Sequence, residues 1–362
     1  MQSLDTDEIL VGRNGSAGII RLNRPKALNS LTLPMVRAIT KALEDFAADT
    51  DVASVVVMGE GERGLCAGGD IRALYQSGRA ESGDATTFWR DEFQLNHAIA
   101  NYSKPYVALM DGITMGGGVG LSAHGSHRVV TERTRLAMPE TGIGYFPDVG
   151  ATWLLPRAPG ETGTWMALTG LDIAAADAIH ANLADHHVRS ADLSKLVDAI
   201  GRLPRRASGA DINAAIAALG EVPAPARLAA NGELIDRFFA FDTVEEIVDA
   251  LEGEHGDFVQ TTRSAVAMRS PTSLKLTLRM LRAGRNSTNL AECLERELGA
   301  CLQILHNPDF YEGIRAAVID KDRNPAWSPA RLVEVHDATI DRFFIPAKPP
   351  LFEKHDEKEP QP

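Results

Sequence analysis

The most informative stretch of this chain is Lys104-Pro-Tyr-Val-Ala-Leu-Met-Asp-Gly-Ile-Thr-Met-Gly-Gly-Gly-Val-Gly120, in which an apolar strand is followed by a turn and three consecutive glycines. Glycines between a strand and a helix let a ligand approach bare backbone N–H groups, which the helix dipole makes attractive to negative charge. A second junction of this kind, Gly64-Leu-Cys-Ala-Gly-Gly-Asp-Ile71, follows a predicted strand. Two backbone donors that converge from separate loops form an oxyanion hole.

The first half of the chain predicts alternating strands and helices. Asn14-Gly15 is a favoured hairpin turn between two short strands. The next helix has Thr32 as its cap and Pro34 in its first turn. Its apolar stripe consists of Val36, Ile39, Leu43 and Phe46. The predicted strands are residues 9–13, 18–22, 53–58, 106–110 and 128–131, with a further helix near residues 86–101, and this alternation indicates an α/β fold.

Strand signals disappear after about residue 175, where Ala-rich and charged amphipathic segments begin. In one of these, Leu274, Leu278 and Leu281 share one helical face. We therefore predict a β/α core at residues 1–200 and a helical region at residues 201–345 packed on it.

Residues 346–362 are predicted to form a disordered tail, because the last dozen are polar and contain proline.

Composition excludes several classes of function. A net charge of −12 argues against nucleic acid or an anionic membrane as the partner. The chain has no apolar run of about 18 residues, and its N-terminus lacks a basic and then apolar signal, so we expect a cytoplasmic protein. The three cysteines are too few and too scattered for a disulfide framework or a zinc site. Cys66 is either a nucleophile or, more in line with burial statistics, a small buried residue beside the loop glycines.

Several motifs resemble those of the crotonase (enoyl-CoA hydratase/isomerase) superfamily. They include Leu22-Asn-Arg-Pro-Lys-Ala-Leu-Asn29, Cys66-Ala-Gly-Gly-Asp-Ile71 and Met115-Gly-Gly-Gly118. The chain is similar in particular to the 3-hydroxyisobutyryl-CoA hydrolase branch. That likeness rests on residues 113–121 and 137–150, and in the helical half on residues 243–247, 270–279, 312–316 and 319–327.

The resemblance implies a β-spiral of ββα units, a helical C-terminal region and an acyl-CoA substrate. It implies that the amides of Gly69 and Gly117 hold the thioester oxygen. It further implies that the substrate contacts Lys26, Ala27, Leu28, Gly68 and Ile71. No metal, flavin or nicotinamide motif is present, so no cofactor is expected beyond the CoA of the substrate. Trimers or paired trimers are common in the superfamily, and a homo-oligomer of this kind is an expectation here too.

Glu140 and Asp148 are the candidate catalytic carboxylates. Glu140 has Met138, Ile143 and Phe146 around it in the sequence, and an apolar pocket raises a carboxyl pKa and makes a better base. The alternative is an exposed turn glutamate in Pro-Glu-Thr-Gly. The resemblance gives Glu140 the catalytic position and assigns Asp148 to the reacting 3-hydroxyacyl group; the alternative for Asp148 is an N-cap of the following helix.

Glu92 is a candidate on physical grounds. It shares one helical face with Phe88, Leu95 and Ile99, whereas Asp91 points elsewhere. A carboxylate on an apolar stripe is costly unless it has a partner, so Glu92 either belongs to a site or makes a structural hydrogen bond or ion pair. It also matches a substrate-contacting glutamate of the hydrolase branch.

Gly120 is the clearest departure from the hydratases of the superfamily, which have a second glutamate at this position to handle water. Two carboxylates cooperate when water adds across a double bond, so Gly120 argues against efficient hydration.

The remaining candidates carry positive charge or an imidazole. Lys26, Arg24 and Arg72 are either ligands of the CoA phosphates or ordinary solvated charges. The histidines His97, His124 and His127 lack metal-ligand spacing with acidic partners and are interpreted as structural.

We therefore expect hydrolysis of the 3-hydroxyisobutyryl-CoA thioester in valine catabolism, with Glu140 as base or nucleophile. Two alternatives remain open: an enoyl-CoA hydratase or isomerase, and a catalytically silent acyl-CoA-binding protein.

Overall fold

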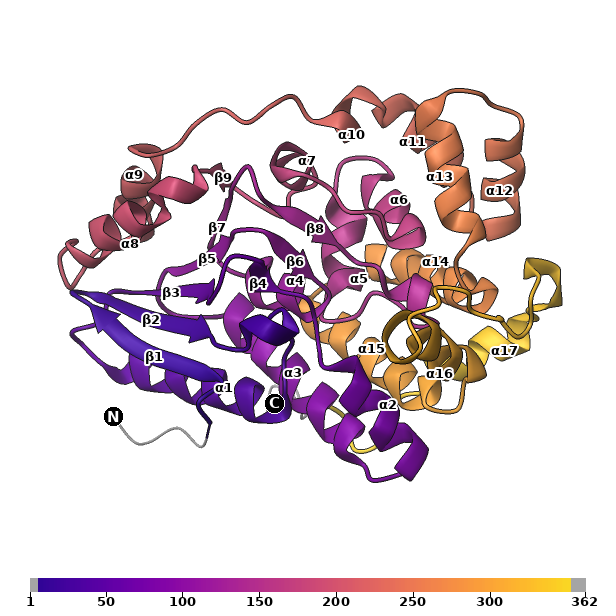
Figure 1. The fold of residues 1–362 in the computed structure, drawn as a ribbon, viewed down its shortest axis with the longest axis horizontal. Helices are drawn as coiled ribbons and strands as arrows, with labels where there is room; N and C mark the ends of the chain where they lie inside the picture. Colours follow the sequence, from indigo (N-terminus) through magenta and orange to yellow (C-terminus); the bar gives the residue numbers. More distant parts are fainter. Residues whose placement is uncertain (1–5, 353–362) are drawn as a thin grey trace, which may run out of the picture.

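The computed structural model describes residues 6–352, and their strands form two sheets (Figure 1). Within this part of the chain, a six-stranded sheet has the order β1-β2-β3-β5-β7-β9, and a three-stranded sheet has the order β4-β6-β8. β1 and β2 form the antiparallel hairpin, and every other pairing is parallel. The strands are β1 (Ile9–Asn14), β2 (Ala17–Leu22), β3 (Ser54–Gly59), β4 (Gly64–Cys66), β5 (Tyr106–Met110), β6 (Ile113–Met115), β7 (His127–Val130), β8 (Arg135–Ala137) and β9 (His186–His187).

From β3 onward the chain winds as a spiral, because the successive strand pairs each give one strand to each sheet. β3 and β4, β5 and β6, and β7 and β8 follow this rule in turn, and helices return the chain to the start of the next pair. This confirms the expected α/β fold with a spiral of β and α units. The second sheet, with strands of three residues, was not predicted.

The inner strands of the large sheet are buried on both faces. Val56 pairs with Ile19 and Val107, and these side chains lie in a cluster with Leu196 and Ile216 of the helices α8 (Leu193–Gly201) and α9 (Gly209–Ala217). The alternate residues of the same strands belong to the other, larger cluster, which includes α1 (Leu33–Ala48) and α3 (Asp84–Ala100). Strands buried on both faces form nearly continuous apolar runs, which is why the sequence revealed them.

Helix α1 begins where the sequence predicted. Thr32 Oγ1 accepts a hydrogen bond from the Met35 amide at 3.3 Å, and Pro34 lies in the first turn. All four members of the predicted stripe are buried. Between β4 and α3 lies a further helix, α2 (Ile71–Ala80), and between β6 and β7 lies the short α4 (Gly117–Ser122).

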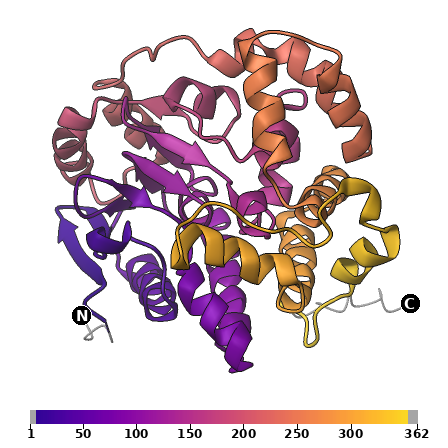
Figure 2. The same cartoon turned by 45° about the vertical axis from the view of Figure 1, so that its right-hand side comes forward.

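The C-terminal helices wrap around the core and share its larger hydrophobic cluster. α15 (Leu290–Ile304) packs on α3, α16 (Pro308–Ile314) packs on α2, and α14 (Pro271–Arg285) packs on α5 (Ala151–Leu154) and α6 (Thr162–Thr169) (Figures 1 and 2). The predicted boundary at residue 200 falls at the end of α8, which packs with α9 on one face of the large sheet. The remaining α-helices of the described residues are α7 (Ala175–His180), α10 (Arg227–Ala230), α11 (Gly232–Phe239), α12 (Val244–Glu252), α13 (Asp257–Ala267) and α17 (Asp337–Asp341).

The first part of the predicted disordered tail is packed instead. Leu351 is 5% exposed, and the amides of Leu351 and Phe352 donate to the Glu295 carboxylate at 3.0 and 2.7 Å. The Phe352 ring lies 4.6 Å from the His97 ring on α3. These two apolar side chains anchor residues that the overall composition had marked as disordered, while residues 353–362 lie outside the described part.

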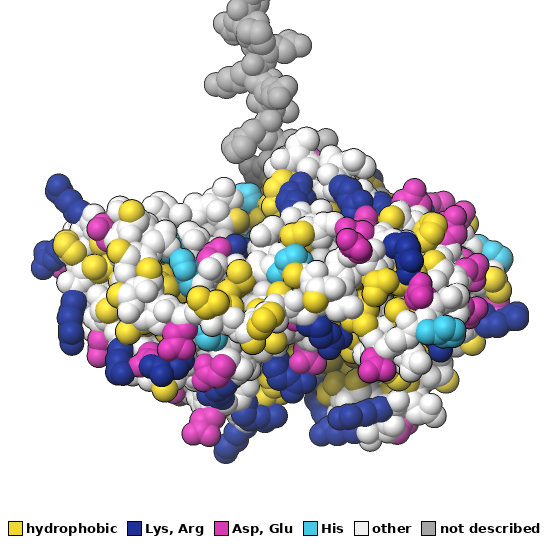
Figure 3. Space-filling model, turned by 90° about the horizontal axis from the view of Figure 1, so that it is seen from above, with side chains coloured by type: hydrophobic (Ala, Val, Ile, Leu, Met, Phe, Trp, Pro, Cys, Tyr) yellow, Lys and Arg dark blue, Asp and Glu magenta, His cyan; other side chains and the backbone are white. Residues whose placement is uncertain are grey.

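Charges of both signs are interspersed on the face drawn in Figure 3, apart from a group of Lys and Arg side chains along its lower margin. Among residues 6–352, no helix is long and apolar enough to cross a membrane.

Candidate active site

A cavity of about 490 Å³ opens where the two glycine loops meet. Its wall is built from the turn after β2, the loops after β4, β6 and β8, and one face of α3. Nine of the candidate residues from the sequence line it: Ala27, Leu28, Gly68, Gly69, Ile71, Arg72, Glu92, Glu140 and Asp148. Gly117 is not among the lining residues, but its neighbour Gly116 is.

The two glycine loops lie side by side because β4 and β6 are parallel neighbours, so their carboxyl ends reach the same edge. Gly68 has a φ of +105°, which favours glycine, and the Gly117 nitrogen lies 3.5 Å from where a Gly68 Cβ would stand. Within the described residues, the amides of Gly69 and Gly117 donate to no protein acceptor. Both amides are therefore free to donate to an oxygen bound between the loops.

Glu140 is buried, so the alternative of an exposed turn residue is wrong. It opens the 3₁₀ turn Glu140–Ile143 after β8 and is 6% exposed. Its Oε1 lies 2.9 Å from where a Gly116 Cβ would stand, and its Oε2 has no hydrogen-bond partner among the described residues. Burial, and then the Asp148 charge, raises the pKa of Glu140 well above its ordinary value.

Asp148 faces the same cavity, and its side chain does not cap a helix. The following helix α5 has Gly150 at its N-cap, with no side-chain cap bond. The Asp148 carboxylate instead accepts a hydrogen bond from the Tyr145 hydroxyl at 2.9 Å. Burial raises the pKa of Asp148 to about 7, although the Tyr145 bond works against this rise.

Glu92 reaches the cavity from α3, on the face that the sequence predicted. It is 2% exposed, and its Oε1 lies 2.6 Å from where a Gly117 Cβ would stand. That oxygen has no hydrogen-bond partner among residues 6–352, so the structural ion-pair alternative is not supported. Burial raises the pKa of Glu92 well above its ordinary value, with further contributions from Asp148 and Glu140.

Position 120 has no room for a side chain. A Cβ on Gly120 would stand 2.7 Å from the Val149 Cβ and 2.8 Å from Asn96 Nδ2. Real Cβ atoms essentially never approach other atoms this closely. The space that a second hydratase glutamate needs is therefore already filled by Val149 and Asn96.

The basic candidates separate into different roles. Arg24 is held by Glu8 and Asp70 at 2.9 and 3.1 Å, so it fixes the loop rather than facing the cavity. Lys26 is exposed on the turn next to Ala27 and is not part of the wall. Arg72 does line the cavity, where it donates to the Val318 carbonyl at 3.1 Å.

Cys66 and the histidines are structural in the described part of the chain, as expected. Cys66 is fully buried, and burial raises the pKa of its thiol to about 12, which leaves it a poor nucleophile. His127 binds Ser126 and the Gly209 carbonyl, and His124 binds the Val149 carbonyl. The His97 ring contacts the Phe352 ring in a tilted arrangement.

Sequence reasoning missed two groups that support the site. Tyr145, which holds Asp148, is stacked on Trp89 with ring centroids 6.1 Å apart. Its hydroxyl also lies 2.9 Å from the Cys301 sulfur of α15. Tyr145 is close to Asp148 in sequence, but Cys301 is 156 residues away from Tyr145, and no local pattern connects them.

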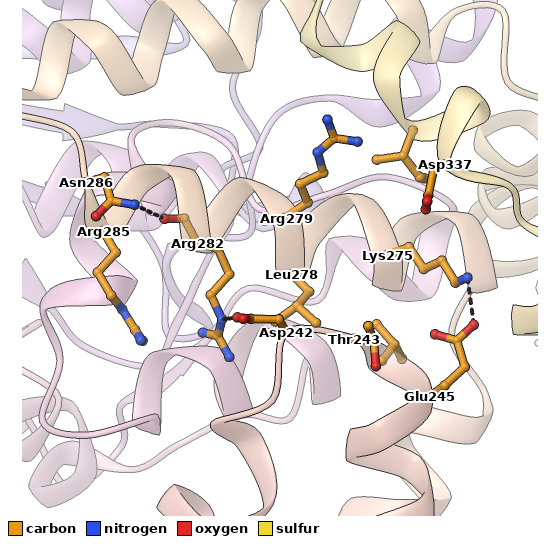
Figure 4. Close-up of a pocket in the computed structure, with 12 residues that line it drawn as sticks. Asp242, Thr243, Glu245, Lys275, Leu278, Arg279, Arg282, Arg285, Asn286 and Asp337 are labelled. Atoms are coloured by element: carbon orange, nitrogen blue, oxygen red, sulfur yellow. Dashed lines mark hydrogen bonds and ion pairs between the residues drawn. The ribbon is translucent and has the colours of Figure 1, made fainter.

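A second cavity, of about 450 Å³, lies between α12, α14 and α17 (Figure 4). Its basic side chains already have acidic partners. Lys275 pairs with Glu245 at 2.6 Å, and Arg282 pairs with Asp242 at 3.1 Å. The carboxyl cluster and Gly69 line the first cavity, and the free amide of Gly117 lies next to its lining residue Gly68, so we assign the chemistry there.

Comparison with known proteins agrees with this geometry. A family model described as enoyl-CoA hydratase/isomerase matches residues 17–344. The chain is 42% identical to the mitochondrial 3-hydroxyisobutyryl-CoA hydrolase of Danio rerio, over 95% of this chain and 91% of that protein. It is 40% identical to the human protein of the same name, over 93% and 88%.

Two solved structures are also similar. One is described as a carnitinyl-CoA dehydratase from Mycobacterium thermoresistibile, with a TM-score of 0.90 and 41% identity over 97% of this chain and all of that one. The other is described as an enoyl-CoA hydratase from Rhodobacter sphaeroides, with a TM-score of 0.87 and 40% identity over 96% of this chain and all of that one. The spiral fold, the paired glycine loops and these matches together show that the chain belongs to the enoyl-CoA hydratase/isomerase family, the crotonases.

Proposed function

We propose that this protein hydrolyses the thioester of 3-hydroxyisobutyryl-CoA to 3-hydroxyisobutyrate and CoA. The relatives at 40–42% identity have this activity in their names. The observation that carries the proposal is one cavity that is lined by Gly69 and by three buried carboxyl groups, with the free amide of Gly117 beside its lining residues Gly68 and Glu92. As the thioester carbonyl is attacked, its oxygen gains negative charge, so the amides of Gly69 and Gly117 stabilise the transition state more than the ground state.

Glu140 acts in one of two ways. It removes a proton from water as the water attacks the carbonyl carbon, or its own carboxylate attacks and forms a mixed anhydride that water then cleaves. In both routes the carbon–sulfur bond breaks and the CoA thiolate takes up a proton. Asp148 and Glu92 orient the hydroxyacyl group and the water. After one turnover in ¹⁸O-labelled water, label in the Glu140 carboxylate supports the anhydride route, whereas its absence favours direct attack by water.

Hydration or dehydration is the alternative that the descriptions of the two similar structures suggest. The absence of both a carboxylate and free space at position 120 favours hydrolysis. The two reactions are separated by assaying thiol release from 3-hydroxyisobutyryl-CoA and loss of enoyl absorbance from crotonyl-CoA. Enoyl loss without thiol release would overturn the hydrolase proposal.

Further features of the function are part of the same proposal. Hydrolysis needs only groups of the chain and water, so no cofactor is required beyond the CoA of the substrate. A role in valine catabolism follows from the substrate.

The cytoplasmic location was inferred from the sequence alone, and the named relatives are mitochondrial, so fractionation of cells is the experiment that decides the compartment. Sedimentation would test for the trimer or hexamer that the family resemblance implies.

A further inference from the structure

The turn that carries Asp148 has strained backbone. Val149 has a φ of +54°, in the left-handed region, and Gly150 follows with a φ of +81°. Glycine adopts such values freely, but for a β-branched residue they are a genuine outlier. Strained backbone persists only where the surrounding structure holds it in place.

Glu297 of α15 holds this turn from the far side. One of its carboxylate oxygens accepts from the Gly150 amide at 2.7 Å. The other accepts from the Thr152 amide at 3.0 Å and from the Thr152 hydroxyl at 2.5 Å. His124 holds the middle of the turn, since its Nε2 lies 2.8 Å from the Val149 carbonyl oxygen.

Glu297 is a buried carboxyl group, which is unfavourable for stability, and this suggests that it has another role. The side chain is fully buried and has no cationic partner among residues 6–352. Burial raises the pKa of Glu297 to about 8, against the effect of its hydrogen bonds. A buried carboxyl of this kind adds little to stability, since apolar residues of similar volume are often as good or better. What it supplies is an acceptor for three donors on the two residues that follow Val149.

We propose that Glu297 is a positioning residue for the hydrolysis: by fixing Gly150 and Thr152 it holds Val149 in its strained conformation and keeps the Asp148 carboxyl in the cavity. The inference rests on the proposed function, which gives Asp148 its role. It makes α15, 147 residues from Gly150 in the chain, part of the catalytic apparatus.

The test compares two substitutions of Val149 in the presence and absence of the Glu297 carboxylate. Glu297→Gln is expected to lower kcat for thiol release by about tenfold, because a buried amide donor loses its acceptor. Val149→Gly then removes the strain, whereas Val149→Ala removes almost the same packing and leaves the strain. In the Glu297→Gln background we expect kcat to be about fivefold higher with glycine than with alanine. With Glu297 intact, the kcat values of Val149→Gly and Val149→Ala should differ by less than fivefold.

Hydrogen exchange of the segment 146–153 provides a readout that does not depend on turnover. Glu297→Gln should speed exchange of the Gly150 and Thr152 amides, and Val149→Gly should slow it again more than Val149→Ala does. Equal effects of glycine and alanine in both backgrounds, or unchanged kcat and exchange in Glu297→Gln, would overturn the positioning role. If Glu297→Gln does not fold, Thr152→Val, which removes one donor to Glu297, should give the same changes at smaller size.

Failure of the proposed function is separate. A wild-type enzyme that releases no thiol would overturn the hydrolase assignment, and the exchange data would still decide whether Glu297 holds the turn.

Discussion

Three carboxyl groups, of Glu92, Glu140 and Asp148, face one cavity without a cationic partner in the described part of the chain. Each ionised carboxyl disfavours ionisation of its neighbours, so the cluster keeps protons to a higher pH than separate groups would. A raised pKa makes an ionised carboxylate a better base, and a protonated carboxyl beside it is a proton donor; hydrolysis needs these two roles for the attacking water and the departing thiolate.

Glu140→Gln should lower kcat for thiol release by about 10²–10⁴-fold while substrate binding is kept, because the amide retains the size of the carboxyl but neither accepts a proton nor attacks. The measurement is single-turnover thiol release together with binding of acyl-CoA by calorimetry. The exposed Glu62 provides the matched control, since Glu62→Gln should leave both unchanged. Normal binding with no effect on turnover of any acyl-CoA would instead favour the catalytically silent alternative.

Asp148→Asn should reduce the pH dependence of stability. The folded protein keeps the Asp148 proton to about pH 7, whereas an unfolded aspartate loses it near pH 4. Between these values the folded state binds more protons, so its stability falls as the pH rises through this range. Asparagine has no such proton, so the stability of the variant does not fall in this way as the pH rises. Its Tm at pH 8 should therefore exceed that of the wild type, by about 2–4 °C for each kcal/mol of unfolding free energy that the variant keeps.

The check is thermal unfolding at pH 5 and pH 8, with Asp249→Asn on the surface of α12 as the control. If the difference in Tm between pH 5 and pH 8 is the same in Asp148→Asn and in the wild type, Asp148 is not a proton-retaining group.

At the scale of elements, sequence periodicity predicted the features that depend on one helix or strand alone, such as which of its faces is buried. The stripe on α3 identified Glu92 because a buried carboxyl interrupts an otherwise apolar face. Strands β4, β6 and β8 have three residues each, too few for a period to show, and they form only because neighbouring loops align them. Glycine patterns found the loops that follow β4 and β6, but only tertiary packing showed that Gly120 has no free space.

Gly120→Ala tests the packing between α4 and the Asp148 turn. The added Cβ meets Val149 and Asn96 at less than 3 Å, so we expect a loss of about 1–3 kcal/mol in stability, as for other overpacked sites. Displacement of Val149 should also lower kcat. Gly232→Ala on α11, where a Cβ meets nothing within 4 Å, is the control and should change neither quantity appreciably. If Gly120→Ala is as stable as the wild type, Val149 and Asn96 move aside at little cost in free energy, and the packing at position 120 is not tight.

For the whole molecule, the sequence predicted the spiral core and the helical region. It did not predict that side chains of the helical region contact the site in the core. Asp148 and Glu140 lie in one motif, so their proximity was foreseeable. Glu297 and Cys301 reach the Asp148 turn from α15, and such contacts depend on how α15 docks on α3 and α5. Nothing in the local pattern around residue 297 distinguishes a buried carboxyl that accepts backbone donors from an ordinary helical glutamate.

The docking of α15 makes the segment 348–352 important for the site, although it lies far from the cavity in sequence. Leu351 and Phe352 donate to Glu295 on α15, and Arg90 of α3 donates to the Pro350 carbonyl at 3.1 Å, so the segment ties together the two helices that carry Glu297 and Glu92. A chain ending at Ala347 should therefore unfold at a lower temperature than one ending at Phe352, since burial of a leucine side chain alone contributes about 1.5–3 kcal/mol. It should also have a lower kcat, because loosened helices no longer fix their carboxyl groups. Differential scanning calorimetry and thiol release on the two truncated chains make the comparison; identical Tm and kcat would show that the helices hold the site without this tie.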